Sequence, residues 1–446
     1  MNFDRMRELL LSQASRGKLV SQLKEEGVVA QIGDVPREVP FTIPKSWKWV
    51  QLKSIGHIVG GGTPKTSVSE YWNGDISWIT PADLGKNTSR WIYAGAKSIT
   101  TKGLKESSAK LMPKGSVVYS SRAPIGHIAI AGQELCTNQG CKSFVPDREY
   151  ITTEWAYYML KARTKDIQSR ASGTTFKEIS GKGMGDTWIT LPPLEEQSRI
   201  VTRLEEAFAE IDRAEKAYQE LQTLSGVLRG QILQEAIQGK LVPQLDCEEE
   251  VEQIGDAPED VLFAIPEKWK WKTLKSITGT ITDGTHHSPK NSQVKDEVFK
   301  NLYVTAKNIK YTGVDLCKQT YVDDEVHAEI VKLCSPAFGD VLFVKDGATT
   351  GVVTVNDLHD SFSMLSSVAL IKTLPEVLDS QYLVYVLRSP VIEKVIRSKM
   401  KGTGIPRVTL KILQSIPIPV PPFVEQLRIV EKVHDLLKQV DALSGK

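Results

Sequence analysis

Polar and cationic side chains recur on predicted turns of this 446-residue chain, in two sets at comparable places. One set begins at residues 60–65 (GGGTPK) and the other at residues 283–290 (DGTHHSPK). Arg, Lys, Gln, Ser and Thr can match the donors and acceptors of base edges or bind phosphates. A solvated turn is the plainer interpretation of each loop by itself, and the paired placement is what favours DNA contact. The candidates are Thr63, Lys65, Arg122, Gln139, Thr174, Thr175 and Lys177 in the first set, and His286, His287, Lys290, Lys307, Lys345 and Arg407 in the second.

A catalytic or cofactor site is not indicated. The glycine-rich stretch lacks the G-x-x-x-x-G-K-[ST] spacing of a phosphate loop, and Pro64 would interrupt the helix that such a loop needs. The adjacent His286 and His287 point different ways on a strand or loop, which disfavours a metal site. Asp340 suggests a nuclease in the second set, but Ser116 replaces it in the first. We therefore predict no catalytic residue, no metal and no cofactor in this chain.

Most of the chain is present twice. Residues 17–20 (GKLV) recur as 239–242 at an offset of 222, and residues 191–201 recur as 420–430 at an offset of 229. The extra residues between these two matches are the kind of growth that loops tolerate. Copies of about 220 residues are too long for a solenoid, which repeats every 20 to 50 residues. The sequence therefore predicts a duplicated domain.

The two ends of the chain complete this duplication. By the repeat alignment, Lys446 corresponds to position 217 and Met1 to position 223. The C-terminal and N-terminal segments together therefore match the central segment. We expect two domains related by a pseudo-twofold axis and held by two equivalent helical spacers.

A long helix should follow each Pro-Pro pair. Pro192-Pro193 precedes Glu195-Glu196, and both proline and acids suit the first turn of a helix. Apolar residues then follow at alternating steps of four and three, as in a coiled-coil seam, although an ordinary amphipathic helix is the alternative. The predicted seam residues are Ile200, Leu204, Ile211, Tyr218, Leu221, Leu228 and Ile232, with Ile429, Val433, Leu436 and Val440 in the duplicate and Met6 and Leu10 completing it.

The segments between these helices show short β-rich runs, at residues 115–120 and 339–344 for example, and short helices at 154–162 and 380–387. The predicted fold is α+β, with two duplicated domains separated by long helices that pair as an antiparallel coiled coil. The predicted segments are an N-terminal helix over 1–20, a first domain over 21–190, a central spacer helix over 191–240, a second domain over 241–418 and a C-terminal spacer helix over 419–446.

Charge and composition are compatible with a DNA-binding protein of the cytoplasm. Residues 21–190 hold 22 Lys and Arg against 15 Asp and Glu, and residues 261–418 hold 20 against 16. A basic surface of this kind suits a phosphate backbone without being diagnostic. Five cysteines without a C-x-x-C pair indicate reduced thiols. No apolar run approaches the length of about 20 residues that spans a bilayer, so we expect no membrane association.

The chain resembles the specificity subunit of type I restriction-modification enzymes across essentially its full length. The resemblance depends on the combination of several motifs, none of which is specific by itself. They are the two Pro-Pro-x-x-Glu-Gln-x-x-Ile-Val helix starts, the Gly-x-Thr-Pro-Lys loop at 61–65, the stretch 78–84 (WITPADL), the stretch 115–126 around Arg122, and Asn138-Gln139.

This resemblance implies two target-recognition domains, each of which reads one half of a split site in double-stranded DNA. It implies two modification subunits that bind S-adenosylmethionine, and restriction subunits that use ATP and Mg. The second copy departs from the family pattern at 283–290 and 345–346. The alternative hypothesis is a DNA-independent coiled-coil scaffold with peptide-binding domains, whose affinity would depend much less on salt.

Overall fold

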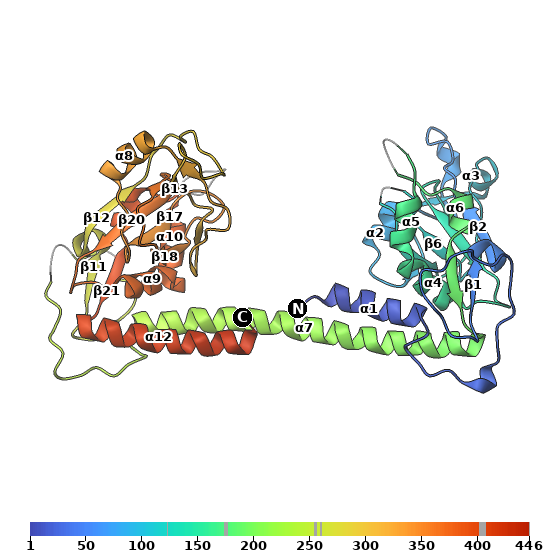
Figure 1. Cartoon of the computed structure of the whole chain (residues 1–446), viewed down its shortest axis with the longest axis horizontal. Helices are drawn as coiled ribbons and strands as arrows, with labels where there is room; N and C mark the ends of the chain where they lie inside the picture. The colour runs from blue at the N-terminus through green and yellow to red at the C-terminus, as the bar shows by residue number, and fades with distance from the viewer. Residues whose placement is uncertain (123, 174–176, 254–256, 259–260, 401–406, 446) are drawn as a thin grey trace. The chain divides into compact units, whose positions relative to one another are not determined.

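The computed structural model describes the chain except for residues 123, 174–176, 254–256, 259–260, 401–406 and 446 (Figure 1). It divides into two compact units, residues 1–217 and 218–446. The 44-residue helix α7 (Leu194–Ile237) contributes to both units. Each unit combines an α+β body with two helices. The predicted α+β class and the long central helix are confirmed, while the five-segment division stays a prediction.

The body of unit 1 is built on a five-stranded sheet in the order β2-β9-β6-β7-β4. A three-stranded sheet, β5-β3-β8, and the pair β1-β10 complete it. The elements are α1 (Phe3–Ser15), η1 (Lys24–Glu26), β1 (Lys48–Gln51), η2 (Leu52–Ser54), β2 (Gly56–Gly60), η3 (Ser69–Tyr71), β3 (Trp72–Ile79), α2 (Pro81–Lys86), β4 (Trp91–Ile92), β5 (Lys97–Ile99), α3 (Thr101–Lys105), β6 (Val117–Tyr119), β7 (Ile128–Ala131), β8 (Cys136–Thr137), β9 (Lys142–Pro146), α4 (Thr153–Ala162), α5 (Thr164–Arg170), α6 (Gly181–Gly185) and β10 (Trp188–Leu191).

The body of unit 2 repeats this plan with a four-stranded sheet in the order β12-β20-β17-β18. The three-stranded sheet β16-β13-β19 and the pairs β11-β21 and β14-β15 complete it. The elements are β11 (Lys270–Thr273), η4 (Leu274–Ile277), β12 (Thr278–Asp283), β13 (Asn301–Val304), β14 (Ile309–Lys310), β15 (Gly313–Val314), β16 (Tyr321–Val322), α8 (Asp324–Leu333), β17 (Val341–Val344), β18 (Val353–Val355), β19 (Ser363–Met364), β20 (Val368–Thr373), α9 (Ser380–Arg388), α10 (Pro390–Ser398), α11 (Leu410–Gln414), β21 (Pro417–Val420) and α12 (Phe423–Ser444).

The central strands of the two main sheets are equivalent. Val117 of β6 pairs with Phe144 of β9, and Val341 of β17 pairs with Ile371 of β20 in the same antiparallel arrangement. Both central strands are fully buried because the sheet is covered on both faces. Val117 packs into the cluster that includes α4, whereas the next residue, Val118, packs into a separate cluster on the other face. This alternation follows from the two-residue period of a strand.

Each unit contains an antiparallel helix pair. In unit 1, Arg7 of α1 forms ion pairs with Asp212 and Glu215 of α7, both at 2.6 Å, while α1 residues nearer its C-terminus pack with earlier residues of α7. In unit 2, α12 runs beside residues 218–237 of α7, where Gln222 Nε2 donates to the Ser444 carbonyl at 3.1 Å and Arg229 pairs with Asp441. Figure 1 shows α12 alongside this part of α7.

The predicted seam is only partly confirmed. The buried seam residues are Ile200, Leu204, Ile232, Ile429, Val433 and Val440, and the half-buried ones are Ile211, Tyr218 and Leu436.

The prediction was wrong for Met6, Leu221 and Leu228, which are 43%, 37% and 41% exposed. A straight helix has 3.6 residues per turn and drifts by about 20° per heptad away from a strict 3.5 period. At Leu221 and Leu228 the contact with α12 falls instead on the following residues, Gln222 and Arg229, which meet α12 through polar groups.

The repeated Glu-Gln pair anchors each helix start to its body. Gln197 accepts a hydrogen bond from the Thr152 amide at 2.8 Å and donates to the carbonyls of Tyr150 and Pro192, both at 2.9 Å. Thr152 is also the N-cap of α4. The neighbouring Glu196 accepts from Trp47 Nε1 at 2.9 Å.

Unit 2 repeats this anchor with the corresponding residues. Gln426 accepts from the Asp379 amide at 2.8 Å, where Asp379 is the N-cap of α9, and Gln426 donates to the carbonyls of Val377 and Pro421. Glu425 accepts from Trp269 Nε1 at 2.9 Å. The motif that made the duplication visible is therefore a buried hydrogen-bond network.

Candidate nucleic-acid interface

The glycine-rich loop of unit 1 packs its backbone closely against two neighbouring segments. A Cβ atom at Gly61 would collide with the Asn138 carbonyl, and one at Gly62 would collide with the Ala109 backbone. The Gly62 carbonyl also accepts from Trp78 Nε1 at 2.8 Å. These contacts hold the loop so that the exposed Thr63 hydroxyl hydrogen-bonds Gln139.

A polar network continues from Gln139 to Arg122. The Gln139 carbonyl accepts from Lys142 Nζ at 3.2 Å, and Lys142 Nζ also donates to Glu178 Oε1 at 3.1 Å. The other oxygen of Glu178 lies 3.8 Å from Arg122 NH1. Three predicted DNA contacts, Thr63, Gln139 and Arg122, thus belong to one connected cluster, which we call the unit 1 tip cluster together with Lys142 and Glu178.

The remaining predicted residues of unit 1 lie on the loops around this cluster. Lys65 and Lys177 are exposed. The backbone carbonyl of Lys65 accepts from Trp72 Nε1 at 3.3 Å, which fixes the loop without occupying the ammonium group. Thr174 and Thr175 lie outside the described residues. The contact of these residues with DNA stays a prediction.

The corresponding region of unit 2 contains a chain of ion pairs. Lys345 Nζ lies 3.1 Å from Asp283 Oδ2 and 3.2 Å from Asp346 Oδ2. Asp346 Oδ1 lies 3.0 Å from Arg407 Nε. His286 lies 3.4 Å from the second oxygen of Asp283. We call Asp283, Lys345, Asp346 and Arg407 the unit 2 tip cluster.

The structure corrects the role predicted for Lys345. Its side chain is only 3% exposed and is held between two carboxylates, so it does not suit direct contact with DNA. A charge at this depth is stable only when it is paired. Lys345 therefore supports the acids that surround it, whereas Arg407, with a side chain 53% exposed, ends the chain of ion pairs at the surface.

The other predicted residues of unit 2 are exposed on loops. His286, His287, Lys290 and Lys307 all lie at the surface. The Lys290 ammonium lies 5.9 Å from the centre of the Phe299 ring, within the range of a cation–π contact.

Sequence reasoning missed the anionic members of both tip clusters and the cation Lys142. Glu178, Asp283 and Asp346 are adjacent to, or a few residues from, predicted residues, but the prediction selected only groups that match bases or phosphates. Equivalence of the two copies was the available signal. An alignment of the equivalent strands places Asp346 at the position that Arg122 has in unit 1. The charge at this position therefore changes sign between the two copies, which indicates that each charge has a partner of the opposite sign.

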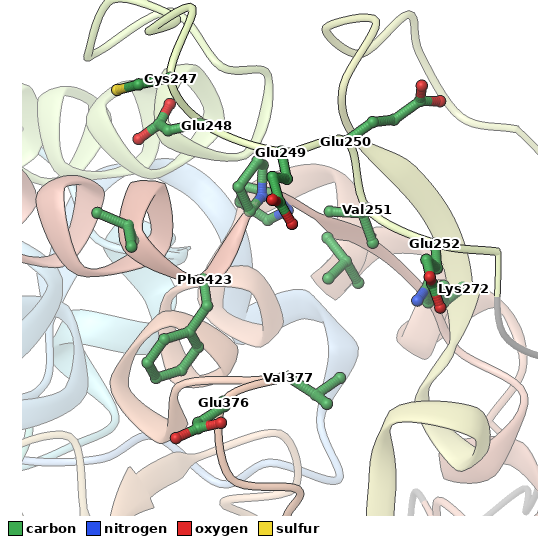
Figure 2. Close-up of a pocket in the computed structure, with 14 residues that line it drawn as sticks. Cys247, Glu248, Glu249, Glu250, Val251, Glu252, Lys272, Glu376, Val377 and Phe423 are labelled. Atoms are coloured by element: carbon green, nitrogen blue, oxygen red, sulfur yellow. The ribbon is translucent and has the colours of Figure 1, made fainter.

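A pocket of unit 2 has a different chemistry (Figure 2). It has a volume of about 510 Å³ and lies in unit 2 at the start of α12. Lys272 is buried at its edge, where unit 1 has the buried Val50, and burial lowers the pKa of its ammonium. Phosphates would be repelled from this pocket by its carboxylates, which are Glu248, Glu249, Glu250, Glu252 and Glu376.

Two further observations bear on chemistry in the described residues. No group of three or more His, Cys, Asp or Glu side chains is arranged there to hold a metal ion. Burial raises the pKa of Cys136, Cys141 and Cys334 to about 12, so their thiols stay protonated near neutral pH and are poor nucleophiles.

Among the described helices, none is both long and apolar enough to cross a membrane.

Comparison with known proteins identifies the family. Residues 44–223 and 266–446 each match the type I restriction modification DNA specificity domain. The chain is 28% identical over 399 residues to the type I restriction enzyme MjaIX specificity subunit of Methanocaldococcus jannaschii, covering 89% of this chain and 87% of that protein.

Solved structures share the fold. A chain from a structure of the type I R-M system aligns with a TM-score of 0.69 at 21% identity, covering 91% of this chain and 93% of that one. The HsdS subunit from Thermoanaerobacter tengcongensis aligns with a TM-score of 0.54 at 20% identity, with the same coverage. The matched segments contain both bodies, both tip clusters and both anchored helix starts, and the chain therefore belongs to the type I restriction-modification DNA specificity family as a specificity subunit with two recognition domains.

Proposed function

We propose that this chain reads a bipartite site in double-stranded DNA, with one half-site per body and without a catalytic residue of its own. The observation that carries this proposal is the pair of tip clusters, which stand on equivalent strands but expose different groups. Exposed cations around them, such as Lys65, Lys177 and Lys290, supply phosphate contacts. Two bodies with the same fold but with different exposed side chains in their tip clusters are suited to reading two different half-sites.

The proposal extends to the partners and their cofactors. We infer that two modification subunits bind this chain and supply S-adenosylmethionine chemistry, and that restriction subunits supply chemistry that depends on ATP and Mg, all in the cytoplasm. Helix α7 offers a surface for one such partner, because Leu224 and Val227 are 65% and 63% exposed beside Leu221 and Leu228. Apolar residues grouped on one exposed helix face are typical of a protein interface.

The DNA proposal is tested by sequencing. The full chain is produced in a host with its proposed modification subunits, and methylated adenines are mapped across the host genome. We expect one motif made of two defined halves separated by a gap of undefined bases. A genome without a new methylated motif, from cells in which the three chains copurify, would contradict the proposal.

The partner surface is tested separately. Replacing both Leu224 and Val227 with Glu should abolish copurification of a modification subunit, whereas Thr223→Glu, a charge on the same exposed stretch, should leave it intact. Unchanged copurification of the double variant would exclude this face as the docking surface.

The acidic pocket favours a second candidate function, a scaffold that binds a basic peptide. Its carboxylates and the apolar side chains of Val251, Val377 and Phe423 would suit a cationic segment with one apolar residue. Salt and sequence discriminate between the two functions. Binding to DNA should weaken steeply as salt rises and should depend on base sequence. Binding of a lysine-rich peptide at this pocket should be lost in Glu249→Lys without any change in DNA binding.

A further inference from the structure

The two tip clusters contain the same ion pair with its charges exchanged. In unit 1, Arg122 and Glu178 face each other across an isolated antiparallel bridge, and in unit 2 Asp346 and Arg407 do so. Arg122 follows β6 at the position where Asp346 follows β17. The arginine therefore lies on the first segment of the bridge in unit 1 and on the second segment in unit 2.

The backbone confirms that these positions are equivalent. The amide of Ile179 donates to the Ser121 carbonyl at 3.1 Å, and the amide of Val408 donates to the Lys345 carbonyl at 2.9 Å. These bonds connect the residues next to each ion pair in the two bodies. Only the side chains have changed, so the comparison isolates the polarity of the pair.

Stability does not explain why both bodies keep an ion pair here. The side chains of Arg122 and Glu178 are 37% and 35% exposed, and those of Arg407 and Asp346 are 53% and 23% exposed. Pairs with this much exposure contribute little to folding. A pair of neutral side chains that hydrogen-bond each other would stabilise this backbone bridge equally well. The retained feature is an arginine at the surface beside a fixed carboxylate.

We propose that Arg122 and Arg407 are the specificity-determining arginines of the two half-sites, and that Glu178 and Asp346 are the positioning residues that orient them. This inference rests on the proposed reading of DNA. A guanidinium group recognises guanine through two parallel N–H groups directed at O6 and N7. The ligand of each arginine is therefore a guanine edge in the major groove.

The geometry leaves these donors available. Arg407 Nε forms an ion pair with Asp346 Oδ1 at 3.0 Å, and the Arg407 side chain is 53% exposed. In unit 1, the separation of 3.8 Å between Arg122 and Glu178 gives electrostatic attraction without occupying a donor. The Glu178 carboxylate is itself held by Lys142 at 3.1 Å, and Asp346 is held by Lys345 at 3.2 Å. Each positioning acid therefore has a buried or nearly buried lysine behind it.

The test measures base preference at every position of both half-sites. The full chain, together with its modification subunits, selects DNA from a pool of duplexes with random sequence, and the selected duplexes are sequenced. Glu178→Gln should reduce the preference for guanine at one position of the first half-site by roughly 5- to 150-fold, the range that corresponds to one bidentate contact. The second half-site should be unchanged, and Asp346→Asn should give the converse result.

Two more variants separate positioning from a structural role. Asp186→Asn removes a comparable exposed ion pair, with Lys53 at 2.7 Å, and should leave both half-sites unchanged. The double variant Arg122→Glu with Glu178→Arg builds the polarity of unit 2 into unit 1. It should keep the melting temperature while changing the base preference at one position, whereas each single reversal should lose preference there.

The outcomes are distinct. A lower melting temperature of Glu178→Gln with an unchanged motif would overturn the inference and make the pair structural. An effect on salt dependence alone would also overturn it, because the arginine would then bind phosphate. Failure of the unaltered complex to select any sequence would contradict the proposed function itself, and the untouched half-site in each variant reports on that function independently.

Discussion

At the helix starts of the two units, Gln197 and Gln426 make the same three hydrogen bonds, whereas at the tips Arg122 and Asp346 carry opposite charges on equivalent strands. Both regions descend from one duplicated sequence. The helix starts are buried, and each of their polar groups would be costly without its partner. The Arg122–Glu178 and Asp346–Arg407 pairs at the tips are partly exposed, so water can replace a lost partner in them. Folding therefore constrains the anchors and leaves the tips free to diverge.

The largest expected effect comes from exchanging a whole body. Residues 48–191 replaced by the same segment of a relative should give a chain that methylates a hybrid motif, new in one half and unchanged in the other. The anchors make this possible because Gln197 bonds mainly to main-chain groups, which any relative supplies. Mapping methylated adenines in the host genome checks it. Simultaneous change of both halves would mean that recognition is a composite surface.

The next effect concerns the buried charges that only unit 2 possesses. Lys345→Ala leaves Asp283 and Asp346 without their shared cation, and breaking such a pair costs about 3 to 5 kcal/mol. Ser121 stands at the equivalent place in unit 1 and donates to the Gly140 carbonyl at 3.1 Å, so Ser121→Ala should cost only about 1 kcal/mol. Denaturant unfolding of the two variants measures both values. Equal losses would show that the tip of unit 2 does not depend on its ion pairs.

The same contrast between buried and exposed positions explains what the sequence could predict. The duplication, the strands around Val117 and Val341 and the start of α7 follow from apolar periodicity and from prolines, and all are confirmed. The seam failed at Leu221 and Leu228 because a fixed 4-3 spacing ignores helical drift and the change of partner from α1 to α12.

The site was predicted only in part, for a related reason. Thr63, Gln139 and Arg122 are brought together as members of one network. Lys345 was predicted to contact DNA, but its buried ammonium group is paired with the neighbouring Asp346 and with Asp283. Asp283 is distant in the sequence, so the local sequence around Lys345 does not reveal this partner. Burial of a cation depends on tertiary contacts, which composition and turn signals do not encode.

A smaller effect separates phosphate contacts from base contacts. Lys65→Ala in unit 1 and Lys290→Ala in unit 2 should each weaken binding to all sequences alike and lower the slope of log affinity against log salt by about 1. Lys394→Ala provides the control, because this exposed lysine lies on α10, which packs beside α7 through Val391 and Gln234. Titration of a fixed duplex at several salt concentrations measures the slopes. Equal slopes for the unaltered chain and both loop variants would remove these lysines from the interface.

The smallest effect tests whether the two anchors are energetically alike. Burial raises the pKa of Glu196 and of Glu425 above the ordinary value of 4.5, although hydrogen bonds from Trp47 and Trp269 oppose this shift. A carboxyl whose pKa is raised by folding stabilises the protein below its unfolded pKa. This contribution is lost as the pH rises through the folded pKa, since the buried group must then ionise.

Replacing Glu425 with Gln keeps an acceptor for Trp269 and removes the ionisation, and Gln244 can rotate its amide to accept from the new side chain. The melting temperature of Glu425→Gln relative to the unaltered chain should therefore increase as the pH is raised from below 4.5 towards neutrality. Glu196→Gln should show the same trend, because burial raises the pKa of both carboxyls. Glu425 Oε1 also accepts from Gln244, whereas Glu196 Oε1 has no hydrogen-bond partner among the described residues. Thermal unfolding across this pH range decides the point. A trend in one unit only would show that the two buried carboxyls have diverged in energy, although both keep the hydrogen bond from a tryptophan.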